Sequence, residues 1–364
     1  MIKNFLSRIP ANLSGNMSER LEPCRMCGQK KGKIIAKVDY WDIKQANIIQ
    51  CPDCKLMQLD PMLSQEDTAK GCLAYYIEET LRVPLKEQER NLIRNFRRGV
   101  VFAHMLKKKK IFPEKVLELG PGSGYFSAGL QFVFPQTQIT VLDVNQEVLD
   151  LNKKNFQYQT IKAIPEEYNG ELENKFDFVI ARDIIEHVID ISQVIKNVNL
   201  YLKENGYFHF ITPNGHEDVW GHYLTFNQKK APSNLLINHV NYFDGKGLIQ
   251  FLEKNNFKEV DYYNYKIKTS LKGRGWKVND KLMAQDSQKL SADHFVQDKI
   301  REIKDHTFNK DEILGKWFIN RNFKTLTYLV SKFHHYKIFK LPPQTNVGHE
   351  IFGLFQKLTN KFKF

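Results

Sequence analysis

A buried strand that runs into a glycine-rich turn is the feature that most restricts the fold of this 364-residue chain. Residues 116–119 are apolar apart from Glu118, and glycines follow at positions 120, 122 and 124, before a helix-forming stretch. Glycines let the backbone turn sharply and lie against a ligand without a side chain in the way. A strand, a glycine turn and a helix make the first part of a βαβ unit, so we expect a parallel sheet.

The rest of the central region alternates strands with helices. This alternation predicts an α/β fold, a Rossmann-like doubly wound sheet with helices on both faces. A basic amphipathic helix over residues 81–110 precedes it. The expected strands are 115–120, 138–144, 176–183, 207–214 and 257–265, with a weaker one at 159–164, and the expected helices lie near 126–134, 145–155, 190–204 and 245–256.

The spacing of the glycine turn argues against two common nucleotide sites. A dinucleotide fingerprint would place a third glycine at position 125, where Tyr125 stands, and a P-loop would end in Gly-Lys-Ser/Thr. Glu118 would repel a pyrophosphate but suits a cationic ligand. Asp143 ends the second strand, nineteen residues after Gly124, and its carboxylate can accept hydrogen bonds from both hydroxyls of a ribose. The pattern indicates an adenosine without phosphates that carries a positive group.

At this point the chain resembles the class I S-adenosylmethionine (SAM)-dependent methyltransferases over about residues 115–265. The motifs that carry the resemblance are E-x-G-x-G-x-G at 118–124, VLDVN at 141–145, and DIIEHV at 183–188, which is similar to an element of small-molecule and sugar methyltransferases. The resemblance implies SAM as the cofactor, with Asp143 on the ribose and Asp183 near the sulfonium. It places the methionine end against Glu118 and the loop of Gly120, Pro121, Gly122, Ser123 and Gly124.

Two Cys-x-x-Cys pairs predict a metal site near the N-terminus. Cys24 and Cys27 form one pair and Cys51 and Cys54 the other, with 23 residues between the pairs. Four thiolates can fill all the positions of a tetrahedral Zn²⁺, which leaves none open for a catalytic water. Short β-branched runs between the pairs favour a small zinc ribbon with a structural ion. Disulfides or free thiols are the alternatives, and Cys72 is expected to be an ordinary core thiol.

The insertion at residues 215–243 should cover the ligand cleft, because it follows the carboxyl end of a strand. Its segment 238–243 resembles the E-H-x-x-Y-F element of methyltransferases with an N-terminal zinc ribbon, including deoxysugar C-methyltransferases. Leu235 and Asn238 replace the tyrosine and glutamate of that pattern, which favours O-methylation over C-methylation. His239 is the first candidate for the general base and His187 the second. For each of them, a hydrogen-bonded role in the scaffold is the alternative.

The charge of the chain suggests an anionic partner. The chain has 54 Lys and Arg but only 41 Asp and Glu, which gives a net charge of +13. The basic, aromatic stretch 310–364 carries about half of this excess. We expect a sugar, glycan or lipid-linked glycan acceptor, with contact between the tail and an anionic membrane surface. An rRNA or tRNA methyltransferase that binds RNA through this surface is the alternative, and a non-catalytic scaffold is a third hypothesis.

Four regions follow from these patterns. They are an N-terminal extension (1–22), a zinc ribbon (23–80), a methyltransferase domain (81–265) and a mainly helical C-terminal region (266–364). The sequence has no apolar run of the length that a membrane-spanning helix needs and no apolar core of a signal peptide. We therefore expect a cytoplasmic protein, peripheral at the inner face of the membrane if the acceptor is lipid-linked.

Overall fold

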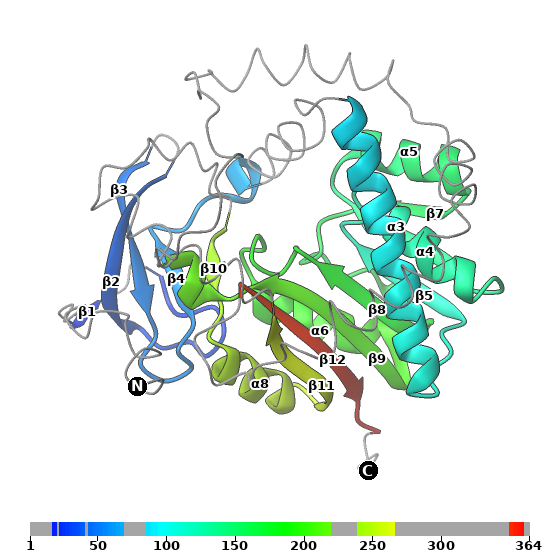
Figure 1. The fold of residues 1–364 in the computed structure, drawn as a ribbon. Helices are drawn as coiled ribbons and strands as arrows, with labels where there is room; N and C mark the ends of the chain where they lie inside the picture. The colour runs from blue at the N-terminus through cyan, green and yellow to red at the C-terminus, as the bar shows by residue number, and fades with distance from the viewer. Residues whose placement is uncertain are drawn as a thin grey trace, which may run out of the picture.

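The chain folds around two sheets that lie side by side (Figure 1). The computed structural model describes residues 17–19, 22–40, 43–68, 85–219, 239–265 and 349–359. A five-stranded antiparallel sheet holds the N-terminal strands, and a seven-stranded sheet holds the central region. Among the helices of these described ranges, none is long and apolar enough to cross a membrane.

The seven-stranded sheet confirms the predicted doubly wound architecture. Its order is β11-β12-β9-β8-β5-β6-β7, and the five strands from β9 to β7 run parallel. The bounds are β5 Lys115–Leu119, β6 Gln138–Asp143, β7 Gln159–Lys162, β8 Phe176–Arg182, β9 Leu202–Pro213, β11 Phe257–Tyr265 and β12 Glu350–Lys357. The glycine turn follows β5, the middle one of the five parallel strands, so its loop lies at the carboxyl edge of these strands.

Helices cover both faces of this sheet, and each face has its own apolar cluster. Helices α3, α4 and α5 pack on one face, and α6 and α8 pack on the other. The bounds are α3 Leu85–Lys108, α4 Tyr125–Val133, α5 Gln146–Phe156, α6 Ile191–Tyr201 and α8 Gly245–Lys254, with a short 3₁₀ turn at Gly170–Leu172. Side chains of Asn145, Asp190 and Asp244 cap the first turns of α5, α6 and α8, which fixes where these helices begin.

Strand β12 corrects the predicted domain boundary. The sequence pattern predicts that the methyltransferase domain ends at residue 265, but Glu350–Lys357 pairs antiparallel with both β9 and β11 and completes the sheet. Its alternate residues enter opposite cores, Ile351 and Phe355 on one face and Phe352 and Leu354 on the other. A strand buried on both faces shows no polar alternation, so it resembled the surrounding aromatic tail. Residues 266–348, expected to be helical, lie outside the described residues.

The N-terminal sheet confirms the predicted ribbon strands and extends them. Its order is β1-β2-β3-β4-β10, with bounds β1 Met17–Glu19, β2 Lys31–Tyr40, β3 Ile43–Gln50, β4 Met57–Asp60 and β10 Asn241–Tyr242. Strand β1 comes from the region expected to be an extension. Strand β10 comes from the insertion of the central domain and pairs with β4. The ribbon is therefore joined to the segment that was expected to cover the cleft.

Candidate active site and cysteine cluster

The glycine loop between β5 and α4 leaves room for a ligand. Gly122 and Gly124 have φ angles of +51° and +76°, which residues other than glycine rarely adopt. A Cβ on Gly124 would lie 2.1 Å from Oδ1 of Asn152, whereas a Cβ on Gly122 would meet no described atom within 4 Å. The loop is therefore packed on one side and open at Gly122.

Glu118 lies beneath this loop and is buried from solvent. Its side chain is 2% exposed and accepts a hydrogen bond from the hydroxyl of Ser127 in α4. Burial raises the pKa of Glu118 to about 7, although Ser127 and the charge of Arg182 act in the opposite direction. A cationic ligand group would favour the ionised carboxylate, so the position suits an ammonium or a sulfonium.

Asp143 and Asp183 reach the same edge from neighbouring strands. Asp143 ends β6 and accepts the backbone N–H of Asn145 at 2.9 Å, and burial raises the pKa of Asp143 to about 6. Asp183 follows β8 with a φ of +55°, and its side chain is exposed. The N–H of Gly120 donates to the carbonyl of Leu142 at 2.8 Å, which holds the loop next to the tip of β6. The structure thus brings the predicted cofactor residues together at one edge of the sheet.

A second polar group lies after β8, and its buried member is Glu186. The side chain of Glu186 is 1% exposed, and its Oε2 accepts the hydroxyl of Thr212 at 2.9 Å. Its Oε1 lies 4.0 Å from Nε2 of His187 and has no hydrogen-bond partner among the described residues. Burial and the charge of Asp183 raise the pKa of Glu186 to about 8, and the charge of His239 opposes them.

The two candidate histidines meet at this point. The rings of His187 and His239 lie with their centroids 4.9 Å apart, and Nδ1 of His239 bonds Oδ2 of Asp218 at 2.6 Å. Burial alone would lower the pKa of His239, but the charge and hydrogen bond of Asp218, with Glu186 and Asp183 nearby, raise it to about 9. His239 is therefore mainly protonated at neutral pH. Only the small fraction of molecules with a neutral His239 can accept a proton there. Sequence reasoning assigned no role to Glu186 or Asp218.

The sequence comparisons agree with the sheet order and the glycine loop. A family model described as "Methyltransferase domain" matches residues 77–262, about half of the chain. The chain belongs to the class I methyltransferases.

Curated relatives of this methyltransferase match part of the chain. A malonyl-[acyl-carrier protein] O-methyltransferase from Bacillus anthracis is 27% identical over 122 residues, 33% of this chain and 45% of the relative. A ubiquinone biosynthesis O-methyltransferase from Proteus mirabilis is 26% identical over 115 residues, which are 30% of this chain and 46% of the relative. A release factor glutamine methyltransferase from Flavobacterium psychrophilum is 24% identical over 249 residues, which are 61% of this chain and 82% of the relative. The chain spans about half the length of the first two relatives.

Solved structures of methyltransferases resemble the chain at low identity. The plantazolicin methyltransferase BpumL in complex with SAH is 12% identical, covers 81% of this chain and 99% of its own, and has a TM-score of 0.44. The Burkholderia thailandensis 1,6-didemethyltoxoflavin-N1-methyltransferase is 12% identical, with 89% and 100% coverage and a TM-score of 0.44. The family match and the strand order, and not these structural similarities, identify the chain as a class I methyltransferase.

Asn241 makes one of the connections between the methyltransferase domain and the ribbon. Backbone N–H groups of Val240 and Asn241 both donate to the carbonyl of Glu186, at 2.9 and 3.0 Å. The Asn241 amide donates to the carbonyl of Val188 at 2.6 Å and accepts a hydrogen bond from Nε2 of Gln58 at 2.9 Å. The oxygen of that Gln58 amide accepts the N–H of Arg25, inside the first cysteine pair, at 3.1 Å. The ribbon thus supports the loop that carries Glu186 and His187.

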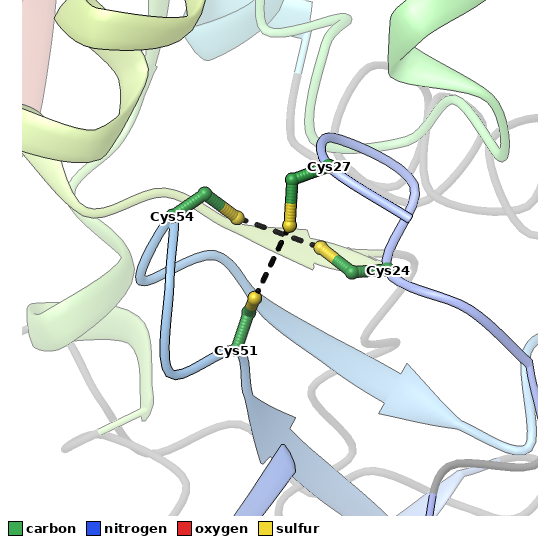
Figure 2. A group of neighbouring side chains, drawn as sticks. All are labelled: Cys24, Cys27, Cys51 and Cys54. Carbon is green, nitrogen blue, oxygen red and sulfur yellow. Dashed lines mark hydrogen bonds between the residues drawn. The ribbon is translucent and has the colours of Figure 1, made fainter. Parts of the chain in front are cut away.

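The four predicted cysteines converge between two similar turns (Figure 2). In each turn the first cysteine accepts an N–H from the fourth residue after it, Gly28 or Lys55, which has a positive φ. The Sγ atoms of Cys24 and Cys54 lie 3.5 Å apart, and those of Cys27 and Cys51 lie 3.4 Å apart. A disulfide would need about 2.0 Å. Sulfurs around one tetrahedral Zn²⁺ lie about 3.8 Å apart, so the arrangement fits a zinc ion.

The ribbon end of this cluster packs into the core of the methyltransferase domain. Cys24, Met26 and Leu56 belong to the same apolar cluster as Val188 and Phe243. A Cβ on Gly247, in the first turn of α8, would lie 2.0 Å from the carbonyl oxygen of Cys54. The backbone of the second cysteine turn therefore touches the helix directly. Cys72, expected to be a core thiol, lies outside the described residues.

Proposed function

We propose that this chain transfers the methyl group of SAM to a hydroxyl oxygen of a sugar, glycan or lipid-linked glycan. The observation that carries the proposal is the position of the His239–Asp218 pair beside Asp183, at the edge of the sheet that holds the glycine loop. In the proposal, Glu118 and the loop bind the methionine end of SAM, and Asp143 binds the ribose. Asp183 then lies nearest to the sulfonium and the acceptor.

The chemistry is an in-line displacement. The acceptor oxygen attacks the methyl carbon, the bond from that carbon to the sulfonium sulfur breaks, and S-adenosylhomocysteine leaves with a neutral thioether. The proton of the hydroxyl group passes to neutral His239, whose Asp218 contact orients the ring and stabilises the imidazolium. A base is needed because a hydroxyl group is a weak nucleophile at neutral pH.

The relatives support oxygen as the acceptor atom. Two of them are O-methyltransferases, for malonyl-[acyl-carrier protein] and in ubiquinone biosynthesis, whereas the relative with the longer match is a release factor glutamine methyltransferase. The assignment of a sugar or glycan rests on the similarity of segment 238–243 to ribbon-bearing sugar methyltransferases. The basic tail would contact an anionic surface if the glycan is lipid-linked.

We also propose a structural Zn²⁺ at Cys24, Cys27, Cys51 and Cys54. Four sulfurs at similar spacing, in two turns of the same geometry, are the donor set of a closed zinc site. The ion would hold the two turns together and so fix Arg25 under Gln58. It takes no part in the chemistry, because four thiolates leave no position for a substrate.

The test is methyl transfer from isotopically labelled SAM to three acceptor pools: soluble saccharides, lipid-linked oligosaccharides and RNA. Label in either saccharide pool, in a base-stable ether linkage, supports the proposal. Label in RNA alone overturns it in favour of an RNA methyltransferase. Asp143→Ala is the control, because a chain that cannot bind SAM should label no pool.

A further inference from the structure

Glu186, His187 and His239 form a second group of metal-ligating side chains, separate from the cysteine cluster. Each of these side chains offers one ligand atom, and these atoms all lie within 4.8 Å of one another. Ligand atoms about 2.0–2.2 Å from one ion lie about 3.0–3.6 Å apart when they are neighbours and about 4.4 Å apart when they are opposite, so side-chain movements of up to roughly an ångström would close the site. The three side chains come from the loop after β8 and from the segment before β10.

The contacts around the group resemble those that orient metal ligands. Asp218 bonds Nδ1 of His239, which leaves Nε2 of that ring as the ligand atom. A carboxylate on the far nitrogen fixes the tautomer and orientation of a metal-binding imidazole. Thr212 likewise binds one oxygen of Glu186, and the other oxygen, Oε1, is buried without a hydrogen-bond partner among the described residues.

Charge favours a cation at the same place. The charges of the carboxyl groups of Asp183, Glu186 and Asp218 all act on the imidazole of His239, and the ring of His187 lies beside it. Glu186 is buried, and a bound cation would stabilise its carboxylate. Two imidazoles and one carboxylate are a donor set for divalent transition metals such as Zn²⁺, Mn²⁺ or Fe²⁺.

We infer that Glu186, His187 and His239 bind one divalent transition-metal ion at the acceptor side of the cleft. The catalytic consequence rests on the proposed function. An acceptor hydroxyl bound to the ion loses its proton to water more readily, and its oxygen then forms the bond to the methyl carbon as the bond to sulfur breaks. With the ion in place, His239 supports deprotonation as a ligand instead of taking the proton itself.

The test is a Mn²⁺ titration of the full chain with the cysteine site loaded with zinc, followed by the electron paramagnetic resonance signal of free Mn²⁺. Mn²⁺ prefers oxygen and nitrogen ligands to thiolates, so it reports the Glu–His group. We expect one bound Mn²⁺ per chain, and binding weakened by at least about tenfold in Glu186→Gln and His239→Ala. His216→Asn is the matched control, because Nε2 of His216 bonds Asp244 at 2.9 Å but lies outside the group.

The inference is overturned if the native chain binds no Mn²⁺ at millimolar concentration, or if Glu186→Gln binds it as tightly as His216→Asn. A separate measurement distinguishes this failure from failure of the proposed function. If EDTA leaves both saccharide methylation and the ribbon zinc unchanged, the ion at Glu186, His187 and His239 is excluded from the reaction, and the proposed function stands. If Mn²⁺ binds as expected but neither saccharide pool is methylated, the ion stands and the function is excluded.

Discussion

Nε2 of Gln58 in the ribbon donates a buried hydrogen bond of 2.9 Å to Oδ1 of Asn241, across 183 residues of sequence. Asn241 in turn holds the carbonyl of Val188, and its backbone holds the carbonyl of Glu186. The cysteine turn and the histidine loop are therefore connected by a short chain of hydrogen bonds. This makes Gln58 a positioning residue for a site that it does not touch.

Replacing Gln58 should impair turnover more than cofactor binding. In Gln58→Leu, the Arg25 N–H and the Asn241 oxygen lose a buried partner, which should cost about 1–3 kcal/mol of stability. We expect a lower Tm and a lower kcat, with the Kd for SAM nearly unchanged. Gln193→Leu is the matched control, because its 2.9 Å bond to Asn197 stays within α6. Equal kcat in Gln58→Leu and the native chain would show that the connection has no role in catalysis.

Zinc removal should loosen the ribbon and the adjacent loop. We expect one tightly held zinc in the Glu186→Gln variant, where the second group cannot contribute, and much weaker retention when Cys27→Ser is added. After chelation, hydrogen exchange should accelerate first in β2–β4 and at 240–243, because β2, β3 and β4 adjoin the cysteine turns in the chain and β10 pairs with β4. Elemental analysis without zinc, or a mass that shows a Cys24–Cys54 disulfide, would contradict this account.

Affinity for SAM should increase with pH. Burial raises the pKa of Glu118 to about 7 and that of Asp143 to about 6, so both carboxyls are mainly neutral below pH 6 in the free protein. Binding of a cation and of ribose hydroxyls favours the ionised forms, so protons are released on binding. The affinity should then rise by up to about tenfold per pH unit for each group, up to pH 7, and level off above it.

Calorimetry in buffers of different ionisation enthalpy measures the released protons directly. Glu118→Gln should lose the part of the pH dependence between pH 6 and 7 and keep the part that Asp143 causes. An affinity for SAM that falls as the pH rises from 5 to 7 would be incompatible with these two carboxyls as ligands.

His239→Ala should lower kcat by about 10²–10⁴, while the Kd for SAM stays nearly unchanged. The reason is that His239, which bonds Asp218 and feels the charge of Glu186, is proposed to act on the acceptor and not to bind SAM. Steady-state kinetics with the labelled saccharide pool provides the measurement, and His216→Asn serves as the control. If His239→Ala retains the native kcat, His239 is part of the scaffold, and His187→Ala becomes the next variant to test.

The parallel sheet was predictable because each strand and helix carries its own local signal. The glycine turn, the apolar strands and the capping residues act within a few positions of each other, so the pattern is visible without the fold. Strand β12 carries no such signal. It is separated from β11 by 84 residues, and its centre is apolar on both faces, so its place between β9 and β11 depends on contacts that the sequence alone does not show.

The candidate site shows the same division between local and distant signals. Glu118, Asp143 and the four cysteines belong to motifs whose spacing indicates the ligand that they bind. Asp218 and Gln58 do not, because one acts on a histidine 21 residues away and the other on an amide 183 residues away. Glu186 stands inside a quoted motif, but its burial and its unpartnered oxygen became visible only in the folded chain.

Isothermal titration of S-adenosylhomocysteine and SAM against the native chain and Asp143→Ala tests the central claim most directly. Loss of a charge-assisted contact to the ribose should cost about 1.5–3 kcal/mol, which lowers the affinity by roughly 10- to 150-fold. Asp150→Ala is the control, since Asp150 lies on the exposed side of α5 and bonds only Gln146 among the described contacts. The account predicts tight binding to the native chain and to Asp150→Ala, and weak binding to Asp143→Ala. Unchanged affinity in Asp143→Ala, or binding of NAD in preference to SAM, would contradict it.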